Sequence, residues 1–328
     1  MEKRFDILTM GELLIDFTHN GTSSQGNGLF ETNPGGAVSN VIAMMNKLGH
    51  STAFMGKVGD DIFGKLLKRT LEELGIDTQN VLEDKEVRTT LAFVANDEMG
   101  DRSFSFYRNP GADMMFTTDE VNEEAIAASR IFHFGTLSMT HSGVREATKK
   151  ALDIAKKNGV LISFDPNLRE SLWDSLDTAK EQFAYGMQFC DVLKISDNEI
   201  QWFIGKEDYE EGVRYLQDTY HIPLIFLTLG KEGSRAYYKN MRVEVPAFVQ
   251  ENTIETTGAG DTFFGSALHF VLEKGMDNLG RDDLKEMLTF ANAAASIITT
   301  RKGALKVMPT KEEVEAMIKN REGSNYQG

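Results

Sequence analysis

Apolar residues recur along the chain in short continuous runs, and helix-like stretches whose apolar positions repeat every three to four residues lie between several of them. Such runs are typical of parallel strands covered on both faces, and the longer repeats are typical of amphipathic helices. Helices are predicted over 37–48 and 62–74, each ended by a glycine, Gly49 or Gly75. The alternation predicts a doubly wound α/β sheet, in which ligands bind beyond the carboxyl ends of the strands. The strand-like runs are 7–10, 53–55, 131–134, 160–164, 192–195 and 224–227.

One region departs from this alternation. Residues 89–94 and 103–107 have the pattern of a β-hairpin, and the polar residues 96–101 form its predicted turn. With residues 15–17 and 28–31, the hairpin could form a small sheet that projects from the main domain as a lid or a dimer contact. The alternative is a hairpin that extends the main sheet.

Composition narrows the functional class. A chain of 328 residues with 41% hydrophobic content can bury a large core, and its net charge of −15 argues against a nucleic-acid-binding protein. The single cysteine, Cys190, excludes an internal disulfide and is expected to be a small buried hydrophobe. Glu12 and Asp16 break the first apolar run, which is therefore too short for a signal peptide. No other run approaches the length of a membrane span. A cytoplasmic location is therefore expected.

The strongest chemical signal is the segment 255–267, Glu-Thr-Thr-Gly-Ala-Gly-Asp-Thr-Phe-Phe-Gly-Ser-Ala. Gly258 and Gly260 let backbone N–H groups converge on an anion, at the N-terminus of the helix that the following apolar run predicts. Asp261 stands where a carboxylate can take a proton from an attacking hydroxyl. A simple Gly-rich turn before a helix is the alternative. The spacing matches neither the dinucleotide-binding fingerprint nor the P-loop.

Longer motifs connect this segment with a known family. The motifs at 33–40 (Asn-Pro-Gly-Gly-Ala-Val-Ser-Asn), 48–49 and 56–64 (Gly-Lys-Val-Gly-Asp-Asp-Ile-Phe-Gly) resemble the N-terminal signature of the ribokinase-like (PfkB) sugar kinases. Residues 256–267 resemble their C-terminal signature. Within the family, bacterial and plant fructokinases are the most similar group and 2-keto-3-deoxygluconate kinases are less so. The motifs that carry this distinction lie at 106–113, 132–137, 165–169 and 172–173.

The resemblance implies one domain over 1–328 with a three-layer α/β/α fold, a doubly wound and mainly parallel sheet, and a small β-sheet lid formed by about 12–33 and 87–113. It implies transfer of the γ-phosphoryl group of ATP to a hydroxyl of a sugar, most closely D-fructose. The nearest alternative is a kinase for 2-keto-3-deoxygluconate or a ribose derivative. A sugar- or nucleotide-binding regulator is the alternative from another class.

The resemblance also implies roles for single residues. Asp261 takes the place of the family's base, and its anion hole is matched by Gly258, Ala259 and Gly260. The sugar-contacting positions are matched by Asp16, Gly35, Gly36 and Asn40. Carboxylate and amide groups suit sugar hydroxyls, and glycines allow close approach of the backbone. From the residues alone, Asp16 could be a solvated carboxylate at a strand end and Asn40 a helix-surface residue.

Two arginines are further candidates for sugar contacts. Arg169 follows a strand end and resembles the family arginine that reaches the substrate. Arg108, at the end of the lid, is expected to contact the sugar only when the lid is closed. The alternative for each arginine is a surface ion pair, which contributes little to stability.

For the nucleotide, Ser196 and Glu199 take the place of an Asn-x-x-Glu motif whose glutamate organises the water shell of Mg²⁺. A capping box explains the same two residues equally well. The loop beside the ribose and phosphates and the adenine neighbourhood are matched by Thr228, Gly230, Gly233 and Asn292. For these the alternatives are a hairpin turn and a helix-face amide.

A monovalent cation site, for K⁺, is implied beside the anion hole. The family has Asp where this chain has Glu255, and Thr257 and Gly303 complete the predicted site. The expected partners are the sugar and ATP, with no nucleic acid and no membrane, and a homodimer formed through the lid.

Overall fold

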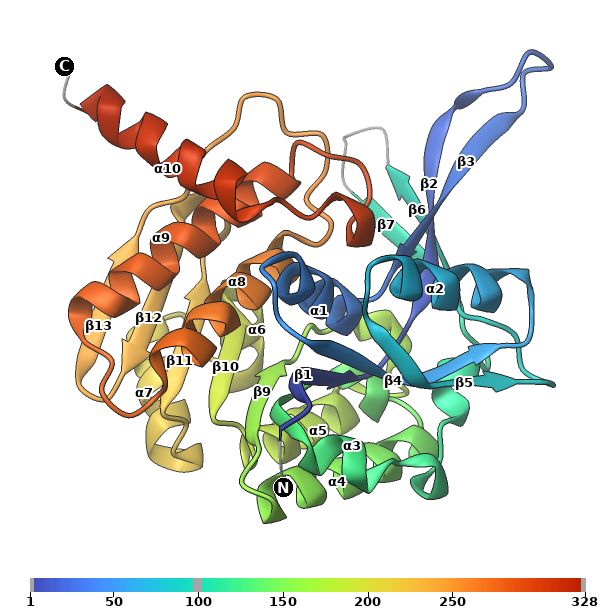
Figure 1. The fold of residues 1–328 in the computed structure, drawn as a ribbon, viewed down its shortest axis with the longest axis horizontal. Coiled ribbons are helices and arrows are strands. Elements are labelled where there is room, and N and C mark those ends of the chain that lie inside the picture. Colours follow the sequence, from blue (N-terminus) through green and yellow to red (C-terminus); the bar gives the residue numbers. More distant parts are fainter. Residues whose placement is uncertain (1–2, 97–101, 326–328) are drawn as a thin grey trace.

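The computed structural model describes residues 3–96 and 102–325 and contains a nine-stranded central sheet (Figure 1). Its strands are β1 (Phe5–Met10), β4 (Thr52–Gly59), β5 (Asp77–Asp84), β8 (Ser129–Gly135), β9 (Leu161–Asp165), β10 (Val192–Ser196), β11 (Leu224–Thr228), β12 (Ser234–Tyr238) and β13 (Met241–Val245). Their order is β13-β12-β11-β10-β9-β8-β1-β4-β5. The strands from β5 to β11 pair in parallel, and β12 and β13 add an antiparallel edge. All six predicted strand-like runs lie in this sheet, which confirms the predicted α/β class.

Helices cover both faces of the sheet (Figure 1). One face is covered by α1 (Ala37–Lys47), α2 (Ile62–Glu73), α8 (Ala259–Lys274), α9 (Arg281–Ile298) and α10 (Lys311–Asn325), and the other by α3 (Glu123–Ala127), α4 (Ser142–Lys157), α5 (Leu176–Met187), α6 (Asp197–Ile204) and α7 (Tyr209–Tyr220). Successive strand residues point to opposite faces. In β11, for example, Phe226 packs in one core and Leu227 in the other. The fold therefore has the three predicted layers.

A second sheet, which corresponds to the predicted lid and keeps that name below, has four strands and stands apart from the main one (Figure 1). It consists of β2 (Leu14–Thr22), β3 (Gly28–Gly35), β6 (Leu91–Asn96) and β7 (Arg102–Tyr107), in the order β3-β2-β6-β7. The predicted hairpin is confirmed, because β6 and β7 pair antiparallel, and the idea that it extends the main sheet is wrong. Most of its predicted turn, 97–101, lies outside the described residues.

Local sequence explains where the first two helices end. Gly49 and Gly75 follow α1 and α2 with φ of 92° and 81°, a left-handed conformation that glycine adopts without strain. The side chain of Asp61 caps α2 by accepting hydrogen bonds from the amides of Phe63 and Gly64.

Cys190 is buried, as expected. Among the described residues, the helices are too short or too polar to span a bilayer.

Candidate active site

Two adjoining cavities lie at the carboxyl ends of the parallel strands, on either side of the first turn of α8. The lid-side pocket, of about 450 Å³, is lined by residues that include Leu14, Asp16 and Asp261. The α6-side pocket, of about 510 Å³, is lined by residues that include Ser196 and Asn292. Four residues line both pockets, namely Asn167, Arg169, Lys194 and Gly260. The two cavities therefore meet beside Asp261.

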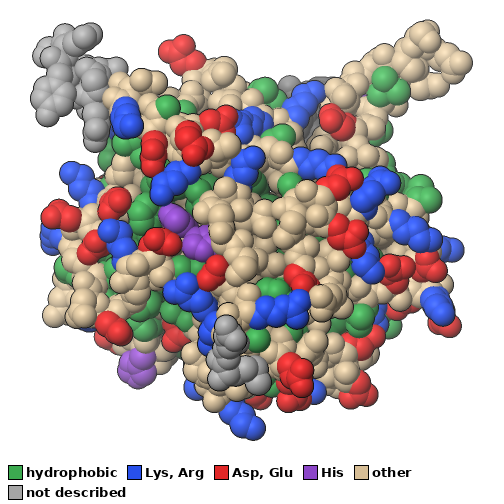
Figure 2. All heavy atoms as spheres, in the orientation of Figure 1, with side chains coloured by type: hydrophobic (Ala, Val, Ile, Leu, Met, Phe, Trp, Pro, Cys, Tyr) green, Lys and Arg blue, Asp and Glu red, His purple; other side chains and the backbone are tan. Residues whose placement is uncertain are grey.

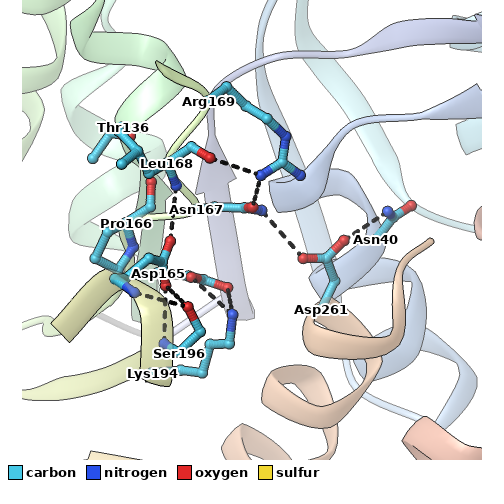
Figure 3. Close-up of polar contacts among 11 residues, drawn as sticks. Asn40, Thr136, Asp165, Pro166, Asn167, Leu168, Arg169, Lys194, Ser196 and Asp261 are labelled. Atoms are coloured by element: carbon cyan, nitrogen blue, oxygen red, sulfur yellow. Dashed lines mark hydrogen bonds and ion pairs between the residues drawn. The ribbon is translucent and has the colours of Figure 1, made fainter. Parts of the chain in front are cut away.

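Asp261 lies in the first turn of α8 and its side chain is buried. Its carboxylate accepts a hydrogen bond from Asn40 Nδ2 at 2.8 Å and a longer one from Asn167 Nδ2 at 3.4 Å (Figure 3). Burial raises the pKa of Asp261, although the Asn40 hydrogen bond and the cations Lys194 and Arg169 oppose the rise. A carboxylate with a raised pKa is a better proton acceptor near neutral pH.

The predicted anion hole is the N-terminus of α8. Gly258 is the N-cap residue and has φ of 75°, which turns the chain into the helix. The first amides of a helix have no acceptor within the helix and carry a partial positive charge. The amide of Ala259 donates to the carbonyl of Thr256 at 3.2 Å and so closes the loop. A side chain at Gly260 would place its Cβ 3.1 Å from Lys194 Nζ, so glycine leaves room for that cation.

Four of the residues predicted to contact the sugar lie around the lid-side pocket. Asp16, Gly36 and Asn40 line it, whereas Gly35 supports it, because a Cβ there would lie 2.6 Å from Asp16 Oδ2. Burial raises the pKa of Asp16 to about 7, against the opposing charge of Arg169. Asn40 Oδ1 is buried and has no hydrogen-bond partner in the described structure. A buried unpaired acceptor is costly unless a ligand satisfies it.

The two arginines lie in different surroundings. Arg169 lines both pockets, and its Nη1 donates to Asn167 Oδ1 at 2.6 Å (Figure 3). The side chain of Arg108 is only 1% exposed and is paired with Asp113 at 2.7 Å. Arg108 also donates to Thr140 Oγ1 and to the Leu137 carbonyl. It is not among the lining residues of either pocket, so its predicted sugar contact stays a prediction that requires this buried network to open.

The six residues predicted for the nucleotide all line the α6-side pocket. Ser196 and Glu199 also form the capping box of α6, and Glu199 accepts a further bond from the Leu168 amide at 2.8 Å. Burial acts to raise the pKa of Glu199, but Lys194 and these hydrogen bonds outweigh it and lower the pKa. Asn292 Oδ1 accepts a hydrogen bond from Ser234 Oγ, and Asn292 Nδ2 donates one to the Val245 carbonyl. Ser196, Glu199 and Asn292 therefore have structural roles in capping and packing and also line the pocket.

Of the three residues predicted for a monovalent cation, Glu255 and Gly303 are in direct contact. Glu255 Oε1 accepts a hydrogen bond from the amide of Gly303 at 2.8 Å, and Thr257 lines the lid-side pocket. Gly303 has φ of 81°, which glycine tolerates. The longer side chain of Glu255 thus turns toward the backbone of the loop that contains Gly303.

Sequence reasoning missed Lys194. It projects from the buried strand β10, and its Nζ lies 3.0 Å from Asp165 Oδ2 (Figure 3). Burial opposes its charge, but Asp165, Glu199 and Asp261 outweigh this effect and raise its pKa. Burial also raises the pKa of Asp165 to about 7, with Lys194 opposing. The available signal was a lysine inside an apolar strand, because a lysine is buried only where an acidic partner pairs with it.

Two other pocket residues were also missed as candidates. Asn167, which donates a hydrogen bond to Asp261, lies two residues after the end of β9 and has φ of 46°. Glu12 lines the lid-side pocket, and its Oε1 accepts a hydrogen bond from the amide of Ala37 at 2.6 Å. Burial raises the pKa of Glu12 to about 7. A carboxylate that interrupts an apolar run was the signal for Glu12.

Similarity to known proteins identifies the family of the chain. The chain matches the profile of the pfkB family carbohydrate kinase over residues 4–311. It is 39% identical over 314 residues to fructokinase-1 of Zea mays, which covers 95% of this chain and 97% of the maize protein.

Two solved structures are similar over nearly the whole chain. Fructokinase with bound ATP from Xylella fastidiosa has a TM-score of 0.88 and 30% identity, covering 96% of this chain and 98% of that one. A fructokinase double mutant from Vibrio cholerae, in a fructose-, ADP- and potassium-bound form, has a TM-score of 0.85 and 28% identity, covering 97% and 99%. The chain therefore belongs to the pfkB family of carbohydrate kinases, enzymes that transfer a phosphoryl group from ATP to a sugar.

Proposed function

We propose that this chain is a fructokinase, that D-fructose binds in the lid-side pocket and that ATP binds in the α6-side pocket. The observation that carries the proposal is the position of Asp261, where the two pockets meet. The names of the similar maize and bacterial proteins support fructose as the sugar. Asn40 Oδ1 adds a buried acceptor that a sugar hydroxyl can satisfy.

The proposed chemistry uses groups already in place. Asp261 accepts the proton of the attacking sugar hydroxyl, and its raised pKa favours that step. The amides at the start of α8 and the Lys194 ammonium stabilise negative charge on the transferred phosphoryl group. Both carboxylate oxygens of Glu199 already accept hydrogen bonds, so we expect Glu199 to hold Mg²⁺ through water rather than directly. Bound there, Mg²⁺ would neutralise charge on the phosphates.

The first test replaces the proposed base. Asp261→Asn keeps the shape of the side chain but removes its basic lone pair, so kcat should fall by roughly 10²–10⁴-fold while sugar and ATP binding change little. Steady-state ADP release and equilibrium binding measure the two effects separately. A variant that retains most of the wild-type kcat would exclude Asp261 as the base.

The second test addresses the sugar. ADP release is measured with D-fructose, 2-keto-3-deoxygluconate and ribose at matched concentrations, and we expect the highest kcat/KM for fructose. A preference for either other sugar would replace the fructokinase assignment by another kinase of the family. Sugar binding without ADP release would instead support a binding regulator.

We also propose a K⁺ site formed by Glu255, Thr257 and the loop that contains Gly303. The potassium-bound form of the similar Vibrio protein supports it, and a cation there could fix the anion hole before phosphate arrives. K⁺ should raise activity above Na⁺ and above a bulky organic cation at matched ionic strength, which removes screening as a cause. Glu255→Gln should reduce the difference. Equal rates in all three salts would contradict the site.

The lid is the proposed dimer contact. Leu29 and Phe30 on β3 and Tyr107 on β7 are 47%, 48% and 64% exposed, a concentration of apolar surface that suits a protein interface. Sedimentation equilibrium should give a dimer for the wild type and a monomer for Phe30→Glu. A monomeric wild type would refute this contact.

A cytoplasmic location remains our proposal, consistent with a single buried cysteine.

A further inference from the structure

A compact group of potential metal ligands lies outside both pockets. Ligand atoms of His50, His269 and Glu273 all lie within 4.8 Å of one another. His269 and Glu273 are four residues apart on α8 and so share one side of that helix, and His50 comes from the turn between α1 and β4. On the face shown in Figure 2, histidine side chains lie together beside charged ones. The group therefore joins two segments that are far apart in sequence.

The two imidazole rings are held in place by their surroundings. His50 Nε2 lies 2.7 Å from His269 Nδ1. The turn that contains His50 is fixed to β1, because the amide of Ser51 donates to Asp6 Oδ2 at 3.0 Å and the amide of Asp6 donates to Ser51 Oγ at 2.9 Å. The ring of His269 packs against Phe270, with 5.0 Å between ring centroids. A ligand site with fixed side chains needs little rearrangement on binding.

We propose that His50, His269 and Glu273 bind Zn²⁺. Two imidazole nitrogens and one carboxylate oxygen form a ligand set that suits zinc and leaves a fourth position for water. The ion would replace the hydrogen between the two ring nitrogens, which moves to the other nitrogen of its own ring. With Zn–N bonds of about 2.0–2.1 Å, tetrahedral geometry requires the two nitrogens to separate by roughly 0.6 Å more.

Asp6 supplies an outer contact for the proposed site. Its Oδ2 lies 3.6 Å from His50 Nδ1, on the side of the ring away from His269. Such a carboxylate beside the second nitrogen of a ligand histidine orients the ring and increases its basicity. Asp6 is itself held by Arg130 at 3.0 Å. Because zinc would tie α8 to the α1–β4 turn, binding should stabilise the folded chain.

The test uses the full chain in metal-free buffer without ATP, titrated with ZnCl₂ in a calorimeter. We expect one equivalent to bind to the wild type, and His50→Gln and Glu273→Gln to weaken this binding by at least about 10-fold. Both substitutions are conservative and lie at positions that are partly or fully exposed. The matched controls His221→Asn and Glu251→Gln change exposed residues outside the group and should bind like the wild type.

A thermal readout accompanies the titration. Zn²⁺ should raise the Tm of the wild type and the controls, and should raise the Tm of His50→Gln and Glu273→Gln much less. Zinc bound elsewhere, for example in the active site, would persist in these two variants. Equal affinity and stoichiometry in wild type and variants, or no binding by the wild type, would overturn the proposal.

Discussion

Arg108 and Arg169 carry the same charge, but different groups surround them. Arg108 neutralises the buried Asp113, whereas Arg169 lies at the junction of the two pockets. Removing one partner of a buried ion pair leaves an uncompensated charge, while removing a pocket cation mainly removes a ligand contact. The two side chains should therefore respond differently to truncation.

We predict that Arg108→Ala lowers the free energy of unfolding by about 3–5 kcal/mol, because Asp113 loses its partner. Arg169→Ala should lower stability much less but raise the KM for the sugar roughly 10-fold or more, with the KM for ATP near that of the wild type. Urea denaturation and steady-state kinetics on both variants measure these effects. A stable Arg108→Ala enzyme with a raised sugar KM would instead place Arg108 in the closed sugar site.

Candidate site residues that are adjacent in sequence gave the clearest signal. Asp261 and the glycines before it are adjacent in sequence, so their spacing alone indicated an anion site. Lys194 could not be predicted in this way, because its partner Asp165 belongs to a neighbouring strand and only strand order brings them together. The burial of Arg108 likewise depends on Thr140 and Leu137, which are distant in sequence.

At the scale of elements, the contact between α1 and α8 positions the proposed base. Asn40 on α1 donates to Asp261 on α8, and the helices approach closely at Gly265. A Cβ on Gly265 would lie 2.7 Å from the Val41 carbonyl oxygen and 2.8 Å from Met44 Cβ. These distances are below normal contact, so a larger residue must push the helices apart.

We predict that Gly265→Ala lowers the free energy of unfolding by about 1–3 kcal/mol, the usual range for overpacking, and also lowers kcat. The control is Gly143→Ala in α4, where the nearest heavy atom to the added Cβ lies at 3.7 Å. The control should keep wild-type activity and stability. If Gly265→Ala behaves like Gly143→Ala, the close contact does not constrain the active site.

The positions of helices and strands were predicted more fully than the pairing between strands. Glycines at helix ends and alternating residues in the hairpin are local signals, and they placed α1, α2, β6 and β7. The small sheet also needs β2 to pair in parallel with β6, across about seventy residues of intervening chain, as in Ile15 opposite Leu91. Periodicity indicates that a segment is a strand but not which strand lies beside it, so the sequence indicated the lid strands but not their order.

At the scale of the whole molecule, buried carboxyl groups dominate the response to pH near neutrality. Burial raises the pKa values of Glu12, Asp16 and Asp165 to about 7 in the folded chain. The folded state therefore binds more protons than the unfolded state between the ordinary carboxyl range and about pH 7. The stability that these groups contribute is complete at low pH and is lost as pH rises through about 7.

Three histidines act in the opposite direction, but at lower pH. Burial lowers the pKa of His50, that of His133 to about 3 and that of His269 to about 4, so on acidification the unfolded chain takes up protons on them first. This effect offsets the carboxyl contribution below about pH 6.5. Above about pH 7 the histidines are mostly neutral in both states, and the carboxyl groups alone set the slope.

We predict that the free energy of unfolding, from urea denaturation, falls between about pH 6.5 and pH 8 as these carboxyl groups lose their protons. Asp16→Asn should make this decrease smaller, because one of the titrating groups is gone, whereas Glu251→Gln at an exposed position should leave it unchanged. Stability that is constant or rises over this range would show that the carboxyl groups are already ionised at pH 7. In that case Lys194 and Arg169 would be compensating the buried negative charge more completely than the geometry indicates.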